Sequence, residues 1–424
     1  MKDLDKYKGC LIGGAVGDAL GYPVEFISAA SIFSRYGQRG ITDYELSDGW
    51  ALVSDDTQMT LFTAYGVLCG RTAEKAEGTD RAYIKQLENA YREWYAIQTR
   101  ANPMPALDHY SRFIMVTGLR ESRAPGMTCM SALSQEKLGS IEKPINNSKG
   151  CGGVMRVAPI GLYFNVLREE QAKVDRLGAE AVALTHGHDL GYIPAAALVH
   201  IVGRVSHDLH MTLTDAVLDM KASIKEQFAG AAHLQEFLEG VDRTMALART
   251  STSDLAAIRQ LGEGWVGDEA LYIALYCALK YEHDFEKAIV TAVNHDGDSD
   301  STGAITGNIL GAYLGLKGIP EKYLKNLELM DLLTTMAEDL YRDCRSEEDA
   351  QRIASTWQMS CVSRCDDAED DEFCESYAPW NMDDEDDDFW PWCIPDENPP
   401  HGNHSGRSPH SDGFEEVEDG EFPF

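Results

Sequence analysis

Two short acidic segments carry the side chains best suited to chemistry. In SDDT, residues 54–57, two adjacent aspartates stand between hydroxyl side chains and open an apolar stretch. In NHDGDSDSTGAITG, residues 294–307, Asp296, Asp298 and Asp300 occupy alternate positions before a run of small residues. Carboxylates held this close together repel one another, so a cation is their expected partner.

The second segment does not fit an EF-hand calcium loop. A loop beginning at Asp296 needs glycine at its sixth position and glutamate at its twelfth, where this chain has Ser301 and Gly307. The two segments instead form two carboxylate pairs, each at the expected start of a helix, where one aspartate would suffice as a cap. Oxygen donors without histidine or cysteine favour Mg²⁺, Mn²⁺ or Ca²⁺ over zinc, and shared carboxylates favour two ions close together.

Helices are the elements that must position these segments. Apolar residues recur at three- and four-residue spacing in residues 81–97, 269–281 and 324–343, which is typical of helices with one buried face. The sequence has no series of alternating β-branched stretches separated by hairpin turns, as an all-β domain would. We therefore predict an all-α fold.

Glycine spacing predicts how two of the helices pack. Glycine recurs at every fourth position in two segments: Gly13, Gly17 and Gly21 in one, and Gly303, Gly307, Gly311 and Gly315 in the other. On a helix this spacing leaves one face almost bare of side chains, so another backbone can approach closely. We expect these two helices to pack together at the centre of the domain.

The charge of the chain is strongly acidic and unevenly placed. The 70 acidic residues against 37 basic ones give a net charge of −33. Residues 365–424 hold 21 acidic residues against Arg407 alone, a net of −20, which leaves −13 for the preceding 364 residues. Neither part has the excess of Lys and Arg that phosphate backbones require, so we expect no nucleic-acid partner.

Cysteine spacing and the N-terminus bear on the location of the protein. The ten cysteines lack the paired C-x-x-C spacing of common zinc sites, and reduced thiols are the simpler interpretation. No stretch is apolar for long enough to span a bilayer, so we expect no membrane partner. Asp3, Asp5 and Asp18 interrupt what would otherwise resemble a signal peptide. We therefore expect a cytoplasmic protein.

The composition changes after about residue 356. The remaining chain is rich in Asp, Glu, Pro and Gly and has no helical period, which predicts disorder. We divide the chain into a domain of residues 1–356 and an acidic, disordered tail of residues 357–424. Four aromatic residues of the tail are candidates for docking a basic partner: Trp380, Phe389, Trp390 and Trp392.

Five segments resemble, in order and spacing, the signature blocks of the ADP-ribosylglycohydrolases. They are GCLIGGAVGDALGYPVEF, SDDTQMTLFT, KGCGGVMRVAPIGLY, ALTHGHDLGY and NHDGDSDSTGAITGNILGAYLG. The resemblance runs from about Tyr7 to about Ser355 and leaves out the acidic tail. This family includes the dinitrogenase reductase-activating glycohydrolases and the ADP-ribosylarginine and ADP-ribosylserine hydrolases.

The resemblance implies a compact all-α domain with a binuclear Mg²⁺ or Mn²⁺ centre. Its metal ligands carry over to Ser54, Asp55, Asp56, Asp298, Asp300 and Ser301. Asp296 lies outside this set and is expected to cap a loop or support the ligands from behind. Glu25, in GYPVEF, matches a carboxylate that orients or activates a water in several family members.

The resemblance also implies substrate contacts. Residues 146–156, NNSKGCGGVMR, resemble the glycine-rich loop that holds the diphosphate and distal ribose, with a simple tight turn as the alternative. The backbone N–H groups expected to approach the phosphates are those of Gly150, Cys151, Gly152 and Gly153. Met155 and Arg156 are expected to open the next helix, with Arg156 paired inside the protein.

Two histidines of THGH are assigned different roles. His186 matches a histidine position of the family and is expected to contact the ligand, whereas His188 is expected to be structural.

In the mechanism that the resemblance implies, two metal ions hold the 2″ and 3″ hydroxyls of the ribose attached to the target side chain. A water held by a carboxylate or a metal attacks C1″, the leaving side chain is protonated, and free ADP-ribose is the product. Carboxylates nearby favour the positive charge that develops at C1″. Loss of Asp55, Asp56, Asp300 or Glu25 is expected to reduce activity most.

The motifs also suggest which bond is cut. HDGDSDST, SDDT and RAPG, residues 123–126, are closest to the arginine-directed hydrolases, so the expected substrate is a protein mono-ADP-ribosylated on arginine. PVEF also suits the bacterial and serine-directed relatives, which leaves O-linked ADP-ribose as an alternative. Two other classes stay open: a non-catalytic ADP-ribose binder, against which the retained aspartates argue, and a metallohydrolase that releases phosphate instead of ADP-ribose.

Overall fold

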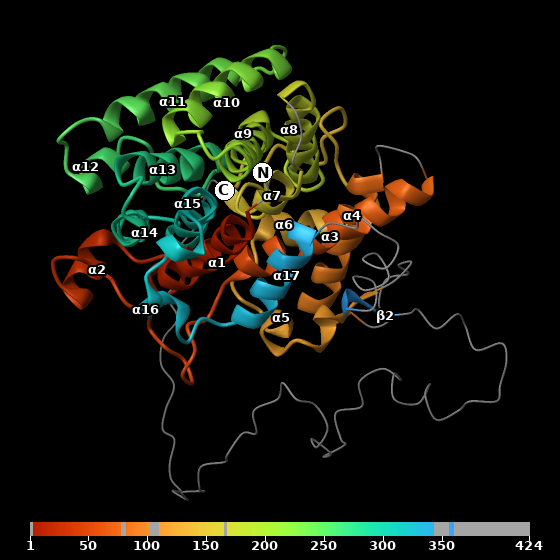
Figure 1. The fold of residues 1–424 in the computed structure, drawn as a ribbon, viewed down its shortest axis with the longest axis horizontal. Coiled ribbons are helices and arrows are strands. Elements are labelled where there is room, and N and C mark those ends of the chain that lie inside the picture. Colours follow the sequence, from red (N-terminus) through yellow and green to blue (C-terminus); the bar gives the residue numbers. More distant parts are fainter. Residues whose placement is uncertain (1–2, 78–81, 102–109, 165–167, 343–355, 360–424) are drawn as a thin grey trace, which may run out of the picture. The chain divides into compact units, whose positions relative to one another are not determined.

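The computed structural model describes residues 3–77, 82–101, 110–164, 168–342 and 356–359 (Figure 1). These residues belong to one unit, Met1–Asp367, and the second unit, Ala368–Phe424, lies wholly outside the described residues. The docking aromatics and the disorder predicted for the tail fall in the part that is not described, and they stay predictions.

The all-α prediction is confirmed for the described residues. Seventeen α-helices follow one another: α1 Leu4–Gly21, α2 Ala29–Tyr36, α3 Asp55–Glu77, α4 Ala82–Gln98, α5 Thr117–Arg120, α6 Met127–Leu133, α7 Ala158–Tyr163, α8 Arg168–Ala183, α9 Asp189–His207, α10 Leu213–Gln227, α11 Leu234–Ala248, α12 Asp254–Ile258, α13 Gly267–Lys280, α14 Phe285–Val293, α15 Ser299–Leu314, α16 Glu321–Leu324 and α17 Met330–Arg342. Short 3₁₀ helices lie at Tyr22–Val24 (η1), Arg112–Met115 (η2), Cys151–Gly153 (η3) and Leu316–Gly318 (η4).

Two very short strands are the exception to the helical architecture. β1, Tyr110–Ser111, pairs antiparallel with β2, Gln358–Met359. Trp357, just before β2, is buried, and its indole N–H donates to Asp339 Oδ2 of α17 at 2.6 Å. The packed part of the chain therefore continues a few residues beyond residue 356.

Helices α1 and α15 lie side by side at the centre of the domain (Figure 1), as the glycine spacing predicts. They run antiparallel, because Gly9 faces Gly311 at one end and Gly21 faces Ser299 at the other. A Cβ added at Gly13 would come within 2.5 Å of the Gly307 carbonyl oxygen, a distance that real Cβ atoms do not adopt. The close approach of the two backbones thus requires glycine on the shared face.

Two predicted helix starts are wrong. The helix expected over residues 324–343 begins only at Met330, because Asn326 and Leu329 have positive φ and the Asn326 carbonyl accepts the Ala51 N–H at 2.7 Å. Pairing with the residue 51 segment therefore overrides the local helical pattern. Met155 and Arg156 lie in a turn before α7 rather than opening it.

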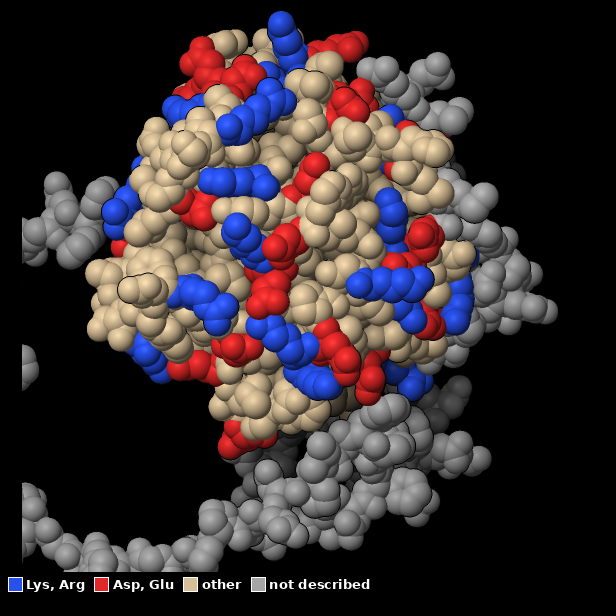
Figure 2. All heavy atoms as spheres, turned by 60° about the vertical axis from the view of Figure 1, so that its left-hand side comes forward, with Lys and Arg blue, Asp and Glu red and all other residues tan. Residues whose placement is uncertain are grey.

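The surface and thiols agree with the composition. The face drawn in Figure 2 mixes basic and acidic side chains without a broad basic patch. The five cysteines among the described residues are free thiols. No single described helix is long and apolar enough to cross a membrane, although α1 and η1 taken together with α2, bent by 94°, meet the criteria of length and composition.

Candidate metal and substrate site

The N-terminus of α3 is held in place by a buried aspartate of α1. Asp18 accepts the Ser54 N–H at 2.9 and 3.1 Å on its two oxygens, the Thr57 N–H at 3.1 Å, and the Thr57 hydroxyl. The free N–H groups of the first turn are thus satisfied by a side chain from another helix. As a consequence, Asp55 and Asp56 need not cap their own helix.

Asp55 and Asp56 differ in what they contact. Asp55 Oδ2 accepts the Gly126 N–H at 3.2 Å, and the Asp55 N–H donates to the Arg123 carbonyl at 3.0 Å, so the RAPG stretch lies against this residue. Asp56 Oδ2 is buried and has no hydrogen-bond partner in the described part of the chain. A buried carboxylate oxygen without a partner is costly unless a cation or water satisfies it.

The N-terminus of α15 brings the second carboxylate pair to the same place. Asp298 is the N-cap and accepts the Ser301 N–H at 3.2 Å, while Asp300 Oδ1 accepts the same N–H at 3.0 Å. Helices α15 and α3 are in contact, and the charge of Asp300 acts on both Asp55 and Asp56. The thiol of Cys151 donates to Asp298 Oδ2 at 2.7 Å. Both predicted ligand segments therefore meet.

Glu25 joins the cluster because α1 ends against the start of α15. A Cβ added at Gly21 would lie 2.6 Å from Asp300 Cα, and η1 then leads the chain to Glu25. One carboxylate oxygen from each of Glu25, Asp298 and Asp300 lies within 4.8 Å of the others. Glu25 Oε2 is buried without a hydrogen-bond partner among the described residues.

Electrostatics at this site are those of crowded, buried carboxylates. Burial, together with the charges of Asp300 and Asp298, raises the pKa of Glu25 to about 10. Burial and the charge of Asp300 raise the pKa of Asp18 to about 7. Burial likewise raises the pKa values of the remaining four carboxyl groups, which are Asp55, Asp56, Asp298 and Asp300. The set therefore ionises only at a large cost unless positive charge is supplied.

These residues fit a divalent-cation centre. Oxygen is the donor type throughout, two buried carboxylate oxygens are unsatisfied, and no lysine or arginine makes an ion pair with the cluster among the described residues. Mg²⁺ and Mn²⁺ prefer such oxygen ligands. The carboxylates that lie close enough to share an ion are Glu25, Asp298 and Asp300. The ligand roles expected of Ser54, Asp55, Asp56 and Ser301 stay predictions.

The glycine-rich loop borders the cluster through Cys151. Two of its four predicted phosphate donors are engaged inside the protein, because the Cys151 N–H donates to the Trp265 carbonyl at 3.1 Å and the Gly150 N–H to Ser148 Oγ at 3.3 Å. The loop continues into η3, which contains Gly152 and Gly153. Its role in phosphate binding stays a prediction.

His186 lies beneath this loop. It is buried, its Nδ1 is 2.8 Å from Thr185 Oγ1, and a Cβ at Gly150 would come 3.4 Å from its Nε2. Burial and the charge of Arg156 lower the pKa of His186 to about 3, so the imidazole is neutral. Arg156 itself is fully buried, donates to Thr185 Oγ1 at 2.8 Å and stacks on Tyr91, which confirms its expected internal pairing.

Comparison with known proteins decides the family. The model of the family described as ADP-ribosylglycohydrolase matches residues 1–350. The chain belongs to the ADP-ribosylglycohydrolase family. Mouse ADP-ribosylhydrolase ARH3 is 24% identical over 383 residues, covering 80% of this chain and 92% of its own. The ADP-ribosyl-[dinitrogen reductase] glycohydrolase of Rhodospirillum rubrum is 24% identical over 338 residues, covering 77% and 91%.

A solved structure titled "ADP-ribosylglycohydrolase-related protein complex" has a TM-score of 0.49 and 22% sequence identity, covering 80% of this chain and 98% of its own. Because the chain belongs to this family, we assign it to the glycohydrolases that act on ADP-ribose. The family depends on metal, in agreement with the acidic cluster, and the identity of the ion is left to experiment.

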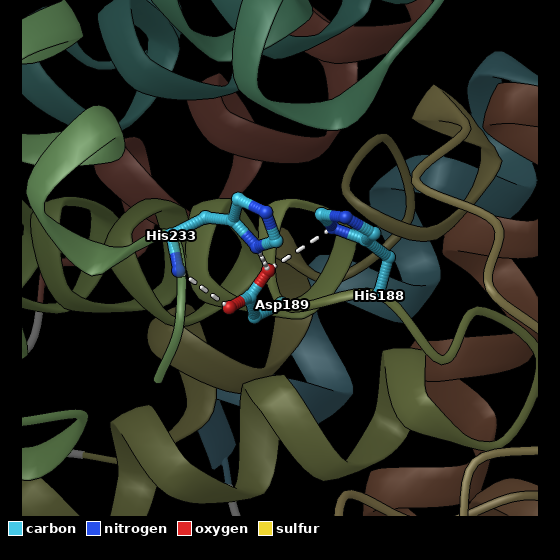
Figure 3. Close-up of side chains that lie close together, drawn as sticks. All are labelled: His188, Asp189 and His233. Carbon is cyan, nitrogen blue, oxygen red and sulfur yellow. Dashed lines mark hydrogen bonds and ion pairs between the residues drawn. The ribbon is translucent and has the colours of Figure 1, made fainter. Parts of the chain in front are cut away.

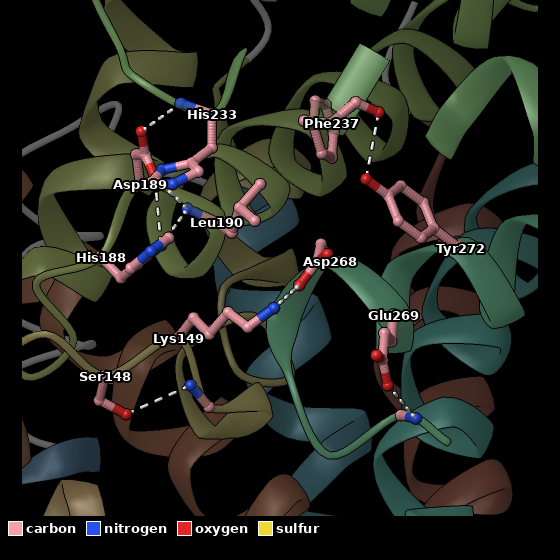
Figure 4. Close-up of polar contacts among 12 residues, drawn as sticks. Ser148, Lys149, His188, Asp189, Leu190, His233, Phe237, Asp268, Glu269 and Tyr272 are labelled. Atoms are coloured by element: carbon pink, nitrogen blue, oxygen red, sulfur yellow. Dashed lines mark hydrogen bonds and ion pairs between the residues drawn. The ribbon is translucent and has the colours of Figure 1, made fainter. Parts of the chain in front are cut away.

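A second group of metal-type residues follows the glycine-rich loop, at the start of α9 (Figure 3). The His233 ring and main-chain N–H groups donate to Asp189 at 2.7 and 2.8 Å. His188 Nδ1 accepts the Leu190 N–H at 3.0 Å and so caps α9, as its expected structural role requires. Figure 4 shows the group beside Lys149, whose Nζ lies 3.7 Å from Asp268 Oδ1.

Two further residues complete the account of the site. Asp296, placed outside the ligand set, accepts the Ala29 N–H at 2.8 Å and two hydrogen bonds from Arg259 at 3.0 and 2.8 Å, so it anchors a loop as expected. Asp18 was not predicted as part of the site. Its only sequence signal is a charged residue inside an otherwise apolar, glycine-rich helix, which is a position that favours a buried polar role.

Proposed function

We propose that this member of the ADP-ribosylglycohydrolase family is a metal-dependent hydrolase that removes mono-ADP-ribose from modified protein side chains. The observation that supports the proposal is that the starts of α3 and α15 bring Asp55, Asp56, Asp298 and Asp300 to one site. There, Asp56 Oδ2 and the neighbouring Glu25 Oε2 have no hydrogen-bond partner among the described residues. Such a set binds divalent ions and, through them, a vicinal diol such as that of ribose. Free ADP-ribose is the proposed product.

The protein groups have separate tasks in this proposal. The ligand set would hold two Mg²⁺ or Mn²⁺ ions, which when bound would orient the ribose hydroxyls and lower the pKa of a water. Glu25 holds and orients the attacking water at its unsatisfied Oε2 and accepts its proton. The remaining carboxylates favour the positive charge that develops at C1″. The loop of Gly150–Gly153, with His186 beneath it, would position the diphosphate.

The bond cut is proposed to be the N-glycosidic bond to arginine. The motifs around the aspartates and the RAPG stretch, which contacts Asp55 through Gly126 and Arg123, support this choice. A leaving guanidine gains a proton and becomes a cation, which an acidic site favours. Hydrolysis of O-linked ADP-ribose on serine would use the same metal centre and is the alternative, since several relatives of this chain are named ADP-ribosylhydrolase ARH3.

The test is release of free ADP-ribose from two matched peptides, one mono-ADP-ribosylated on arginine and one on serine. Each is incubated with Mg²⁺, with Mn²⁺ and with chelator. Release from the arginine peptide alone, abolished by chelator, supports the proposal. Release from the serine peptide alone keeps the reaction and replaces the linkage. Binding of ADP-ribose without release from either peptide would make the protein a binder, and release of phosphate would make it a phosphoesterase.

A further inference from the structure

The most exposed large apolar side chains of the described residues lie beside the acidic site. Met127 is 81% exposed and Phe26 is 72% exposed, more than any other large apolar residue described. Phe26 follows Glu25 directly in the chain, and Met127 follows Gly126, whose N–H binds Asp55. Exposed apolar side chains that adjoin a candidate site are available for contact with its ligand.

Phe26 is held in its exposed position against a local cost. Its φ is +63°, a left-handed conformation that an aromatic residue rarely adopts and that the surroundings must stabilise. Its ring stacks on Trp265, with centroids 5.2 Å apart and an angle of 18° between the rings. Trp265 in turn accepts the Cys151 N–H of the glycine-rich loop. Phe26 therefore projects outward from a fixed position between Glu25 and that loop.

Met127 is presented by a second strained loop. Ala124 in the RAPG stretch has a φ of +52°, and the stretch is tied to α3 by the hydrogen bonds that Asp55 makes with Arg123 and Gly126. Met127 is the first residue of α6 and extends into solvent. Two loops attached to different residues of the acidic site, Glu25 and Asp55, thus each carry an exposed apolar side chain.

We propose that Phe26 and Met127 form an apolar rim that binds the polypeptide of the modified protein, at apolar residues next to the ADP-ribosylated side chain. This inference rests on the proposed function. If ADP-ribose occupies the acidic site, the polypeptide attached at C1″ lies outside it, and Phe26 and Met127 are exposed apolar side chains next to residues of that site. The rim then contributes to recognition of protein substrates and not to cleavage itself.

The experiment compares three substrates that share one linkage, whichever the wild-type protein accepts. The first is a single modified amino-acid amide, the second a peptide with leucine on both sides of the modified residue, and the third the same peptide with serine on both sides. The variants are Met127→Ser and Phe26→Ser. Leu209→Ser is the matched control. Leu209 is also exposed, by 58%, and it follows the C-terminal end of α9, outside the proposed rim.

Removing either rim side chain should raise KM for the leucine-flanked peptide and lower its kcat/KM by about five- to tenfold, the loss expected from one partly buried apolar contact. Cleavage of the amide and of the serine-flanked peptide should change little, and Leu209→Ser should change none of the three. Equal losses of kcat/KM on all three substrates, or no loss on any of them, would contradict the proposal that Phe26 and Met127 bind the polypeptide. Wild-type protein that cleaves no substrate at all would instead overturn the proposed function on which the rim rests.

Discussion

The acidic site and the His188, Asp189 and His233 group both contain residues that commonly bind metals, yet their charges are balanced in different ways. In the histidine group the ring and main-chain N–H groups of His233 satisfy both oxygens of Asp189. In the acidic site Glu25 Oε2 and Asp56 Oδ2 have no hydrogen-bond partner among the described residues. Hydrogen bonds within the histidine group satisfy Asp189, whereas the acidic site keeps buried oxygens that a cation would satisfy.

The pKa values of Asp189 and Glu25 move in opposite directions, because only Asp189 has hydrogen-bond donors that outweigh burial. Burial opposes ionisation of Asp189, but the hydrogen bonds from His233 outweigh it and lower the pKa of Asp189. Burial and like charges raise the pKa of Glu25 to about 10. Residue type alone therefore does not identify a metal site, and unsatisfied buried oxygens are the better criterion.

The largest effect is expected from a substitution of Asp300 in the acidic site. Asp300→Asn should lower ADP-ribose release by roughly 10³-fold, within the range typical of losing a group that positions a catalytic centre. Without divalent ions the variant should melt at a higher temperature than the wild type, because one of several repelling charges is gone. Turnover within tenfold of the wild type would contradict the assignment of Asp300.

Divalent ions should stabilise the protein through the acidic site and not through the histidine group. At a Mg²⁺ or Mn²⁺ concentration of 100 times Kd, the stabilisation expected for one site is about 2.7 kcal/mol. Calorimetry should show this increase in the wild type and in Asp189→Asn, and a much smaller one in Asp300→Asn. If the stabilisation by Mg²⁺ or Mn²⁺ depended on Asp189, the ion would bind at the histidine group and not at the acidic site.

The pH dependence of the chelated protein should show the raised pKa of Glu25. A carboxyl group whose folded pKa is raised stabilises the fold below its unfolded pKa, and this stability is lost as the pH rises towards the folded pKa of about 10. Between pH 6.5 and 8 the wild type should therefore lose up to about 1.4 kcal/mol per pH unit relative to Glu25→Gln.

His186 and His295 do not titrate in that pH window, since burial lowers the pKa of His186 to about 3 and that of His295 to about 4. Denaturant unfolding in chelator at three pH values measures the difference. Parallel profiles for the wild type and Glu25→Gln would show that the Glu25 carboxyl is not perturbed.

The smallest effect is expected from the histidine group. Asp189→Asn should destabilise the fold by about 1–2 kcal/mol at pH 7, since it weakens two hydrogen bonds from His233. Because the pKa of Asp189 is lowered, this difference should shrink as the pH falls below the unfolded value of about 3.9. Turnover at saturating metal should not change. A loss of turnover would show that the group contributes to the reaction.

The sequence predicts features that depend on local spacing better than features that depend on distant contacts. Helix type and the bare faces of α1 and α15 follow from periodicity, and the structure has both. The role of Asp18 could not be predicted, because its hydrogen-bond partner Ser54 lies 36 residues away in the chain. The late start of α17 has the same cause, since the preceding residues pair with Ala51.

The candidate ligands could be predicted because each pair lies within one motif. Which of their oxygens accept hydrogen bonds could not be predicted. Whether an oxygen of Glu25 or Asp56 finds a donor depends on every neighbour in three dimensions. The same holds for the engaged N–H groups of Gly150 and Cys151. The exposure of Phe26 and Met127 is likewise a property of the folded surface, since apolar residues are expected inside on average.

The glycine contact between α1 and α15 joins residues almost 300 positions apart in the chain. During synthesis α1 leaves the ribosome long before α15 is made. Its apolar surface therefore cannot pack against α15 until that helix has emerged. The long loop that must close before this contact forms predicts slow folding, with the first helix exposed to chaperones in the meantime. Metal binding would follow this contact, because the site is incomplete until the start of α15 has emerged.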